Sequence, residues 1–248
     1  MNLEAVWHDL ECGAYREDLP LWRTLAEHAG GRVLDVGAGT GRVTLDLAAR
    51  GVEVVALDLA APLLDALACR ADGLPVDRVV ADARNFALER RFSLVLVPLQ
   101  TLQLFDGSAG RGAFLRCARE HLAPGGLLAA ALADALDCFD GEHDMPPPPD
   151  AREILGVRYA SQLLAVLDEG DRAAIHRRRE VIGPQQHEAC DVVIRLDRVS
   201  ADEVAEEARE LGFLSEPPVF IPQTETYLGA TVVMLRRPGS NAPPRGRR

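Results

Sequence analysis

The stretch Val33-Leu34-Asp35-Val36-Gly37-Ala38-Gly39-Thr40-Gly41-Arg42 decides how the first half of this chain is expected to fold. Apolar residues lead into an acid, three glycines alternate, and a helical apolar pattern then begins at Val43. The stretch predicts a buried strand that turns sharply into a helix, because glycine adopts backbone conformations barred to other residues. The first turn of that helix offers unpaired N–H groups and a positive dipole end to an anionic group.

The spacing of the glycines indicates which ligand the turn binds. A nicotinamide or flavin fingerprint, G-x-G-x-x-G, would need its third glycine at position 42, where this chain has Arg42. The observed pattern, Asp-x-Gly-x-Gly-x-Gly, resembles motif I of the class I S-adenosylmethionine (SAM)-dependent methyltransferases. The alternative is a tight strand–helix turn that binds nothing. The resemblance implies cofactor contacts for Asp35, Gly37, Ala38, Gly39, Thr40 and Gly41.

Two further acids follow predicted strands at the positions that this resemblance requires. Asp58 ends the apolar run 52–57, 21 residues after Gly37, where a carboxylate can accept hydrogen bonds from both ribose hydroxyls. Alternatively, Asp58 is the N-cap of the next helix. Asp82 and Ala83 close the run that begins at Val79, and the resemblance implies that they contact adenine, although Asp82 is equally suited to an ordinary turn. Leu59, beside Asp58, is also expected at the cofactor.

The resemblance covers most of residues 30–135. A fourth strand is expected at 92–97, a helix-ending turn at 122–126 and a fifth strand at 127–132. The predicted fold is therefore α/β: a Rossmann-like, seven-stranded, mostly parallel sheet with helices on both faces. An antiparallel β insertion follows the fifth strand, and a last strand at 230–235 pairs antiparallel with the sheet.

The remaining organisation is predicted by composition and pattern. Residues 1–30 are expected to form an N-terminal helical lid, with Pro20 breaking or starting a helix, and residues 31–145 the SAM-binding core. Residues 146–198 are expected to form the antiparallel insertion over the substrate site, with extended segments at 157–168, 172–182 and 191–197. Residues 199–237 supply a helix that opens with a Ser200/Glu203 capping box, and the closing strands of the core. Residues 238–248 are expected to be a disordered tail.

The segment after the fourth strand predicts the acceptor pocket. Pro98 is expected at the cofactor, and Gln100, Thr101 and Gln103 can position a polar acceptor without a charge that competes with the sulfonium. We predict catalytic roles for Gln100, Gln103 and, from the lid, Tyr15; the alternative is that they are packing or capping residues. If the pocket lies elsewhere, Tyr159 and Tyr227 are the alternative candidates.

Composition limits the class of function. The net charge of −11 disfavours nucleic acid as a partner, and the absence of lysine excludes Schiff-base and P-loop chemistry. The five scattered cysteines indicate reduced thiols and no metal site. Without a signal peptide or a membrane span, we expect a cytoplasmic monomer or homodimer.

Methyl transfer from SAM mainly requires alignment, a dry pocket and an unprotonated nucleophile. A hydroxyl usually needs a base or a metal, whereas a neutral amine needs neither. Because no dedicated base motif is present, the sequence favours a nitrogen acceptor over oxygen or carbon. The predicted function is SAM-dependent methylation of a small molecule in specialised metabolism. The alternative is a SAM-binding protein without transferase activity.

Overall fold

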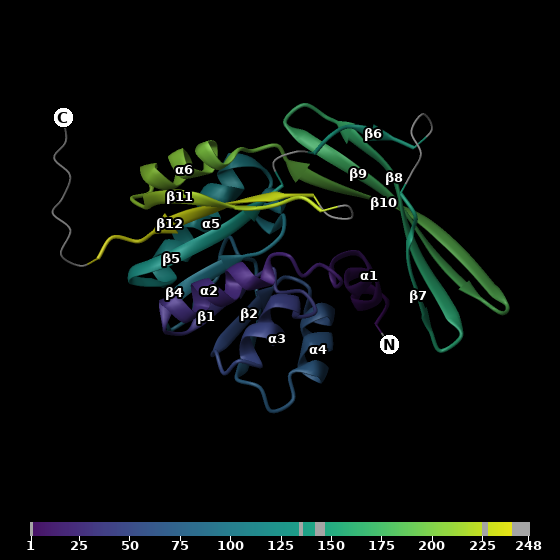
Figure 1. The fold of residues 1–248 in the computed structure, drawn as a ribbon, viewed down its shortest axis with the longest axis horizontal. Coiled ribbons are helices and arrows are strands. Elements are labelled where there is room, and N and C mark those ends of the chain that lie inside the picture. Colours follow the sequence, from purple (N-terminus) through teal and green to yellow (C-terminus); the bar gives the residue numbers. More distant parts are fainter. Residues whose placement is uncertain (1, 134–135, 142–146, 225–227, 240–248) are drawn as a thin grey trace.

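The computed structural model describes residues 2–133, 136–141, 147–224 and 228–239. Its main element, the core sheet, has seven strands in the order β11-β12-β5-β4-β1-β2-β3 (Figure 1). The strands of the core sheet are β1 (Val33–Val36), β2 (Val54–Asp58), β3 (Val76–Val80), β4 (Phe92–Val97), β5 (Leu122–Leu132), β11 (Leu214–Ile221) and β12 (Ala230–Arg236).

The pairing of these strands confirms the predicted Rossmann-like fold. Strands β1 to β5 pair in parallel with their neighbours, while β12 runs antiparallel to β5. The expected antiparallel last strand is therefore present. It lies inside the sheet, because β11 pairs with its outer side.

Helices cover both faces of the core sheet. The helices are α1 (Leu3–Cys12), α2 (Leu19–Ala29), α3 (Arg42–Ala48), α4 (Ala61–Arg70), the 3₁₀ helix η1 (Thr101–Leu104), α5 (Gly107–His121) and α6 (Ala201–Glu210). On β4, Val95 and Val97 pack with α5 and α6, whereas Leu94 and Leu96 pack with α2 and α3. This alternation is expected of a strand buried on both faces. It explains why β1 and β4 are apolar except at Asp35 and Ser93.

A second sheet forms after β5, as predicted. We call it the insertion sheet: β6 (Phe139–Asp140), β7 (Asp150–Ile154), β8 (Val157–Asp168), β9 (Arg172–Gly183) and β10 (Gln186–Asp197). Its strand pairs are all antiparallel, and it extends away from the core sheet, with α1 lying between the two (Figure 1). Helix α1 contacts α4 on one side and β7 and β8 on the other. A short N-terminal helix thus bridges the two sheets.

Several strand boundaries differ from the prediction: β10, expected over 191–197, begins at Gln186, and β3 and β5 also begin before their expected starts. Strand β3 begins at Val76. The sequence does not reveal this start, because β3 lies at the edge of the core sheet and its exposed Asp77 and Arg78 interrupt the apolar pattern. Strand β5 begins at Leu122, which pairs with Phe92 before a bulge, so the expected turn 122–126 belongs to the strand. Within the described residues no helix is long and apolar enough to span a bilayer. Most of the predicted disordered tail, residues 240–248, lies outside the described residues, as does Tyr227.

Candidate active site

The glycine turn, residues 37–41, joins β1 to α3 at the carboxyl edge of the core sheet. The N–H groups of Gly37 and Ala38 donate to the Leu57 carbonyl oxygen, at 2.9 and 3.1 Å, which fixes the turn to β2. Gly39 has a φ of +55°. A Cβ atom there would lie 2.2 Å from Nε2 of His8, so the ring of His8 packs directly on this glycine. The turn therefore needs glycine both for its conformation and for its contact with α1.

Asp35 stands at the end of β1, just before this turn. Its Oδ2 accepts a hydrogen bond from the Thr44 hydroxyl at 2.6 Å, while Oδ1 has no partner among the described residues. Burial raises the pKa of Asp35 to about 6, although the Thr44 hydrogen bond opposes the shift. A buried acceptor without a donor is costly, and a ligand donor at this position would satisfy it.

Asp58 ends β2 next to the glycine turn. Its Oδ2 accepts from the Gly39 N–H at 2.8 Å and its Oδ1 from the Ala60 N–H at 2.9 Å. The N-cap of α4 is Ala60, so the alternative interpretation of Asp58 as an N-cap is wrong. Each carboxylate oxygen keeps a further lone pair for a ligand. Beside it, the side chain of Leu59 is 70% exposed, an apolar surface next to a polar acceptor.

The third predicted acid is engaged by its neighbour. Oδ1 of Asp82 accepts from the Arg84 N–H at 2.9 Å, and Nη2 of Arg84 lies 2.7 Å from Oδ2. These hydrogen bonds hold the pKa of Asp82 below its usual value. Asp82 thus acts as a turn residue, as the alternative interpretation expects. A ligand that binds Asp82 would share the carboxylate with Arg84. Ala83 and Pro98 are buried, and Pro98 accepts from the Thr101 hydroxyl at 3.0 Å.

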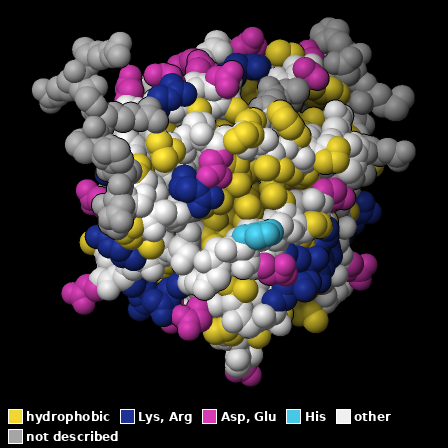
Figure 2. Space-filling view, turned by 60° about the vertical axis from the view of Figure 1, so that its left-hand side comes forward, with side chains coloured by type: hydrophobic (Ala, Val, Ile, Leu, Met, Phe, Trp, Pro, Cys, Tyr) yellow, Lys and Arg dark blue, Asp and Glu magenta, His cyan; other side chains and the backbone are white. Residues whose placement is uncertain are grey.

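A cavity of about 520 Å³ lies between the carboxyl edge of the core sheet, the end of α1 and the insertion sheet. Tyr15 and Gln100 line it, as the prediction of an acceptor pocket requires. In the space-filling view, one face of the molecule is hollowed, with hydrophobic side chains gathered in the hollow and charged ones around it (Figure 2). The charged residues that line the cavity are Glu11, Asp18, Asp137, Asp150 and Arg177.

Gln103 does not join Gln100 and Tyr15. It is 1% exposed, and it is not among the described residues that line the cavity. Its Nε2 donates to the carbonyl oxygens of Ala133 and Asp197, at 3.3 and 3.0 Å, and its Oε1 accepts from the Ala133 N–H at 2.9 Å. Gln103 therefore ties the end of β5 to the end of β10. Nothing in the local sequence could separate its role from that of Gln100.

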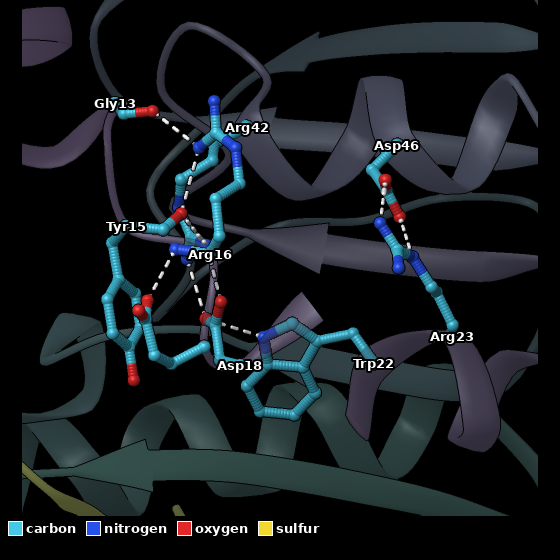
Figure 3. A network of polar contacts seen from close by, with 9 residues as sticks. Gly13, Tyr15, Arg16, Asp18, Trp22, Arg23, Arg42 and Asp46 are labelled. Carbon is cyan, nitrogen blue, oxygen red and sulfur yellow. Dashed lines mark hydrogen bonds and ion pairs between the residues drawn. The ribbon is translucent and has the colours of Figure 1, made fainter. Parts of the chain in front are cut away.

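Arg42, the residue that rules out the nicotinamide fingerprint, holds the segment between α1 and α2. Its Nη1 and Nη2 lie 2.5 and 2.7 Å from the two carboxylate oxygens of Asp18, and both side chains are buried (Figure 3). Trp22 donates from Nε1 to the same carboxylate at 2.7 Å. The Arg42 guanidinium also lies 5.2 Å from the centre of the Tyr15 ring. Tyr15 thus reaches the cavity from a segment anchored on the first helix after the glycine turn.

Glu11 connects α1 to the insertion sheet. Nε and Nη2 of Arg179 donate to its two oxygens at 2.8 and 2.7 Å, and the Ser161 hydroxyl donates to Oε1 at 2.7 Å. Trp7 packs edge-on against Tyr159 at 5.7 Å between ring centres. Tyr159 is therefore a packing residue between α1 and β8. Neither Glu11 nor His8 carries a sequence signal for the site, because only the placement of α1 brings them there.

Comparison with known proteins identifies the fold's family. Residues 33–126 match the model of a methyltransferase domain. A stretch of 144 residues is 33% identical to the cypemycin N-terminal methyltransferase of a Streptomyces species, covering 58% of this chain and 56% of that protein. Residues 33–126 therefore form a methyltransferase domain of the class I SAM-dependent kind. The match spans little more than half the length of this relative.

Two solved methyltransferase structures are similar over nearly the whole chain. The sugar N-methyltransferase KedS8 from a Streptoalloteichus species superimposes with a TM-score of 0.72 at 17% identity, over 95% of this chain and 93% of that chain. The glycopeptide N-methyltransferase MtfA, solved with SAM, gives 0.60 at 27% identity, over 91% and 96%. Because these superpositions cover more than nine-tenths of the chain, the similarity to methyltransferase structures extends to the insertion sheet.

The residues of this site fit SAM, the cofactor of the methyltransferases that the chain resembles. SAM carries donors on its ammonium group, ribose and adenine, and the site presents acceptors at Asp35, Asp58 and Asp82. The buried Oδ1 of Asp35 tests this fit. It has no hydrogen-bond donor among the described residues, and a donor group of the cofactor would supply one.

Proposed function

We propose that this chain transfers a methyl group from SAM to a nitrogen atom of a small molecule held in the cavity between the core sheet and the insertion sheet. The observation that carries the proposal is the cavity itself, which Tyr15 and Gln100 line at the carboxyl edge of the sheet. Ligands of open α/β sheets bind at this edge. SAM supplies a methyl group on a positively charged sulfur, so the protein has to align the acceptor and exclude water.

The ionisable groups of the cavity support nitrogen as the acceptor atom. Among its described lining residues there is no histidine. Burial raises the pKa of Cys12 to about 11, so its thiol stays protonated. Arg179 and Ser161 hold the pKa of Glu11 below its usual value, which makes it a poor base, and the Asp18 carboxylate is ion-paired with Arg42. A neutral amine carries its own lone pair and needs no base.

The comparisons support the same substrate class. MtfA, at 27% identity, is a glycopeptide N-methyltransferase, and the cypemycin relative acts at a peptide N-terminus by its name. We therefore infer that the acceptor is an amine of a specialised metabolite, either on a sugar or at the end of a peptide.

The test is methyl transfer from SAM with a radiolabelled methyl group to a panel of amino sugars and short peptides, each paired with its hydroxyl analogue. We expect label in the amines and equimolar S-adenosylhomocysteine (SAH). Label in the hydroxyl analogues alone would contradict the nitrogen assignment. SAM binding without transfer to any member would favour the alternative, a SAM-binding protein without transferase activity.

Asp58→Ala tests the cofactor end of this proposal. Loss of a charge-assisted acceptor should weaken SAM binding by about 1–3 kcal/mol, measured by titration calorimetry. The matched control is Asp65→Ala, on the exposed surface of α4, which should leave the affinity unchanged. An unchanged affinity in folded Asp58→Ala would remove Asp58 from the site.

Gln100→Ala and Tyr15→Phe test the acceptor end. Both should lower turnover by about tenfold, the effect of losing one positioning hydrogen bond, with little change in SAM affinity. Gln103→Ala is the informative control, because Gln103 binds only backbone groups among the described residues and should lower stability. Wild-type turnover in both Gln100→Ala and Tyr15→Phe would place the acceptor elsewhere.

A further inference from the structure

His8 is a half-buried titratable side chain to which the proposed reaction assigns no role. It lies on α1, and its ring covers Gly39, the second glycine of the glycine turn. Its Nδ1 lies 3.2 Å from the Thr40 hydroxyl oxygen. The ring therefore sits on the segment that the cofactor has to approach, while α1 comes from outside the core sheet.

The neighbours of His8 fix which ring nitrogen carries the proton. Asp9 is held by Arg70, whose Nη2 lies 2.5 Å from Oδ2. Burial raises the pKa of Asp9, but the hydrogen bonds from Arg70 and Thr40 outweigh it and hold the pKa below its usual value. Asp9 is thus an ionised carboxylate that only accepts hydrogen bonds.

Because Asp9 only accepts, the Thr40 hydroxyl must donate its single proton to Oδ1 of Asp9, at 2.6 Å. Thr40 then faces His8 with a lone pair, so Nδ1 of His8 is the N–H donor. In a neutral imidazole the other nitrogen, Nε2, is then an acceptor. The chain Arg70–Asp9–Thr40–His8 orients this acceptor over Gly39.

His8 is neutral near pH 7. Burial lowers its pKa below the ordinary 6.5, and Arg42 on α3 acts in the same direction. Asp58 at the end of β2, with Asp9 and Glu11 on α1, opposes the shift but does not reverse it. Asp58 has the largest of these electrostatic effects on His8, and it also accepts the Gly39 N–H. The ring and this carboxylate therefore flank the same glycine.

We propose that Nε2 of His8 accepts a hydrogen bond from the ribose of the cofactor, beside Asp58. A ribose offers two hydroxyl donors, and the site offers two acceptors on either side of Gly39. The inference rests on the proposed function, since it assumes that SAM binds at the glycine turn. It makes α1 part of the cofactor site and gives a positioning role to Thr40 and Asp9.

The test measures binding of two ligands by calorimetry: SAH, and 5′-methylthioadenosine, which has the ribose but lacks the amino-acid half. His8→Phe keeps a ring without the acceptor and should weaken both ligands by about three- to tenfold. His8→Gln, whose amide oxygen can replace Nε2, should restore most of the affinity. His28→Phe, on the exposed side of α2, is the matched control and should change neither.

A loss confined to SAH would overturn the ribose assignment, because the contact would then belong to the amino-acid half. No loss for either ligand would show that the ring only packs on Gly39. If the wild-type protein binds neither ligand, the proposed function fails instead. The melting temperature of each variant separates a lost contact from a lost fold.

The pH dependence of SAH binding gives a second readout. Wild-type affinity should fall as the pH drops from 7 to 5, because protonated Nε2 can no longer accept, whereas the decline should be smaller in His8→Gln. Asp35 also titrates near this range, and the difference between the two proteins isolates His8 from it. Identical pH profiles would contradict the proposal.

Discussion

The core sheet and the insertion sheet are held by different forces. In the core sheet, Val95, Leu96 and Leu128 are fully buried, and hydrophobic clusters cover both faces. In the insertion sheet most residues of β7, β8 and β10 are exposed or half-buried, and the sheet is joined to the rest of the molecule by charged side chains together with two small apolar clusters. The core sheet, which is proposed to hold the cofactor, is packed on both faces. The insertion sheet, which is proposed to cover the acceptor, depends in addition on ion pairs for its attachment.

This difference has a consequence for charge. In the core, an ionised group is costly unless a partner compensates it, because burial removes its hydration. At the junction with the insertion sheet, paired ionised groups supply part of the attachment. Removing an uncompensated charge from the core should therefore raise stability, whereas removing one member of an ion pair in either half should lower it.

The largest expected effect comes from the buried Arg42–Asp18 ion pair, which links the segment between α1 and α2 to α3. Arg42→Met leaves the Asp18 carboxylate buried, with the Nε1–H of Trp22 as its remaining side-chain donor among the described residues, which should cost about 3–5 kcal/mol of unfolding free energy. Urea denaturation measures the loss. Arg23→Met, which removes a guanidinium from the solvent-facing pair with Asp46, is the control and should have a small effect. Equal losses in the two variants would break the comparison.

The buried carboxyl of Asp35 tests the cost of an unpaired charge in the core, with a smaller expected effect on stability. Its pKa is raised to about 6 in the folded chain, whereas the unfolded chain ionises it near 3.8. Folding thus favours the protonated form, so the contribution of Asp35 to stability is greatest below pH 4 and falls as the pH rises to about 6, by about 3 kcal/mol. Denaturation midpoints at pH 4 and pH 7 measure the change. Asp35→Asn should abolish this part of the pH dependence; a wild-type slope in Asp35→Asn would place the titrating group elsewhere.

The same contrast explains what the sequence could predict. The fully buried strands β1 and β4 read as apolar runs, and the capping box of α6 is present as expected, with Ser200 and Glu203 bonded reciprocally. Strands with exposed surfaces were harder to recognise. β7 is exposed at nearly every position, so it has no alternation, and β11 carries two prolines beside a bulge at the sheet edge, which argues against a strand.

The site was predictable where one local segment defines it. The glycine turn and Asp58 belong to consecutive β-strand ends, and their spacing follows from the fold. His8, Glu11 and the joint at Gln103 depend on contacts between segments 30 to 150 residues apart. No pattern along the chain encodes such contacts, because they follow from how α1 and the insertion sheet pack.

The smallest expected effect tests the attachment of the insertion sheet. Burial raises the pKa of Glu11, but the hydrogen bonds from Arg179 and Ser161 outweigh it and hold the pKa below the ordinary 4.5. Its contribution to stability is therefore complete above about pH 4.5 and is lost as the pH falls through the lowered value, the opposite sign to Asp35. Glu11→Gln should cost about 1–3 kcal/mol at pH 7 and flatten the acid limb of the stability profile.

The matched control for this variant is Glu169→Gln, at the exposed turn between β8 and β9, where a similar pair with Arg195 faces solvent. Because water screens that pair, the control should change stability little. Glu11→Gln should also weaken acceptor binding more than SAM binding, since Glu11 lines the cavity and joins α1 to the sheet above it. If the two glutamine variants behaved alike in both measurements, the insertion sheet would be held by its apolar contacts with α1, such as Trp7 on Tyr159, and the contrast between the two halves would fail.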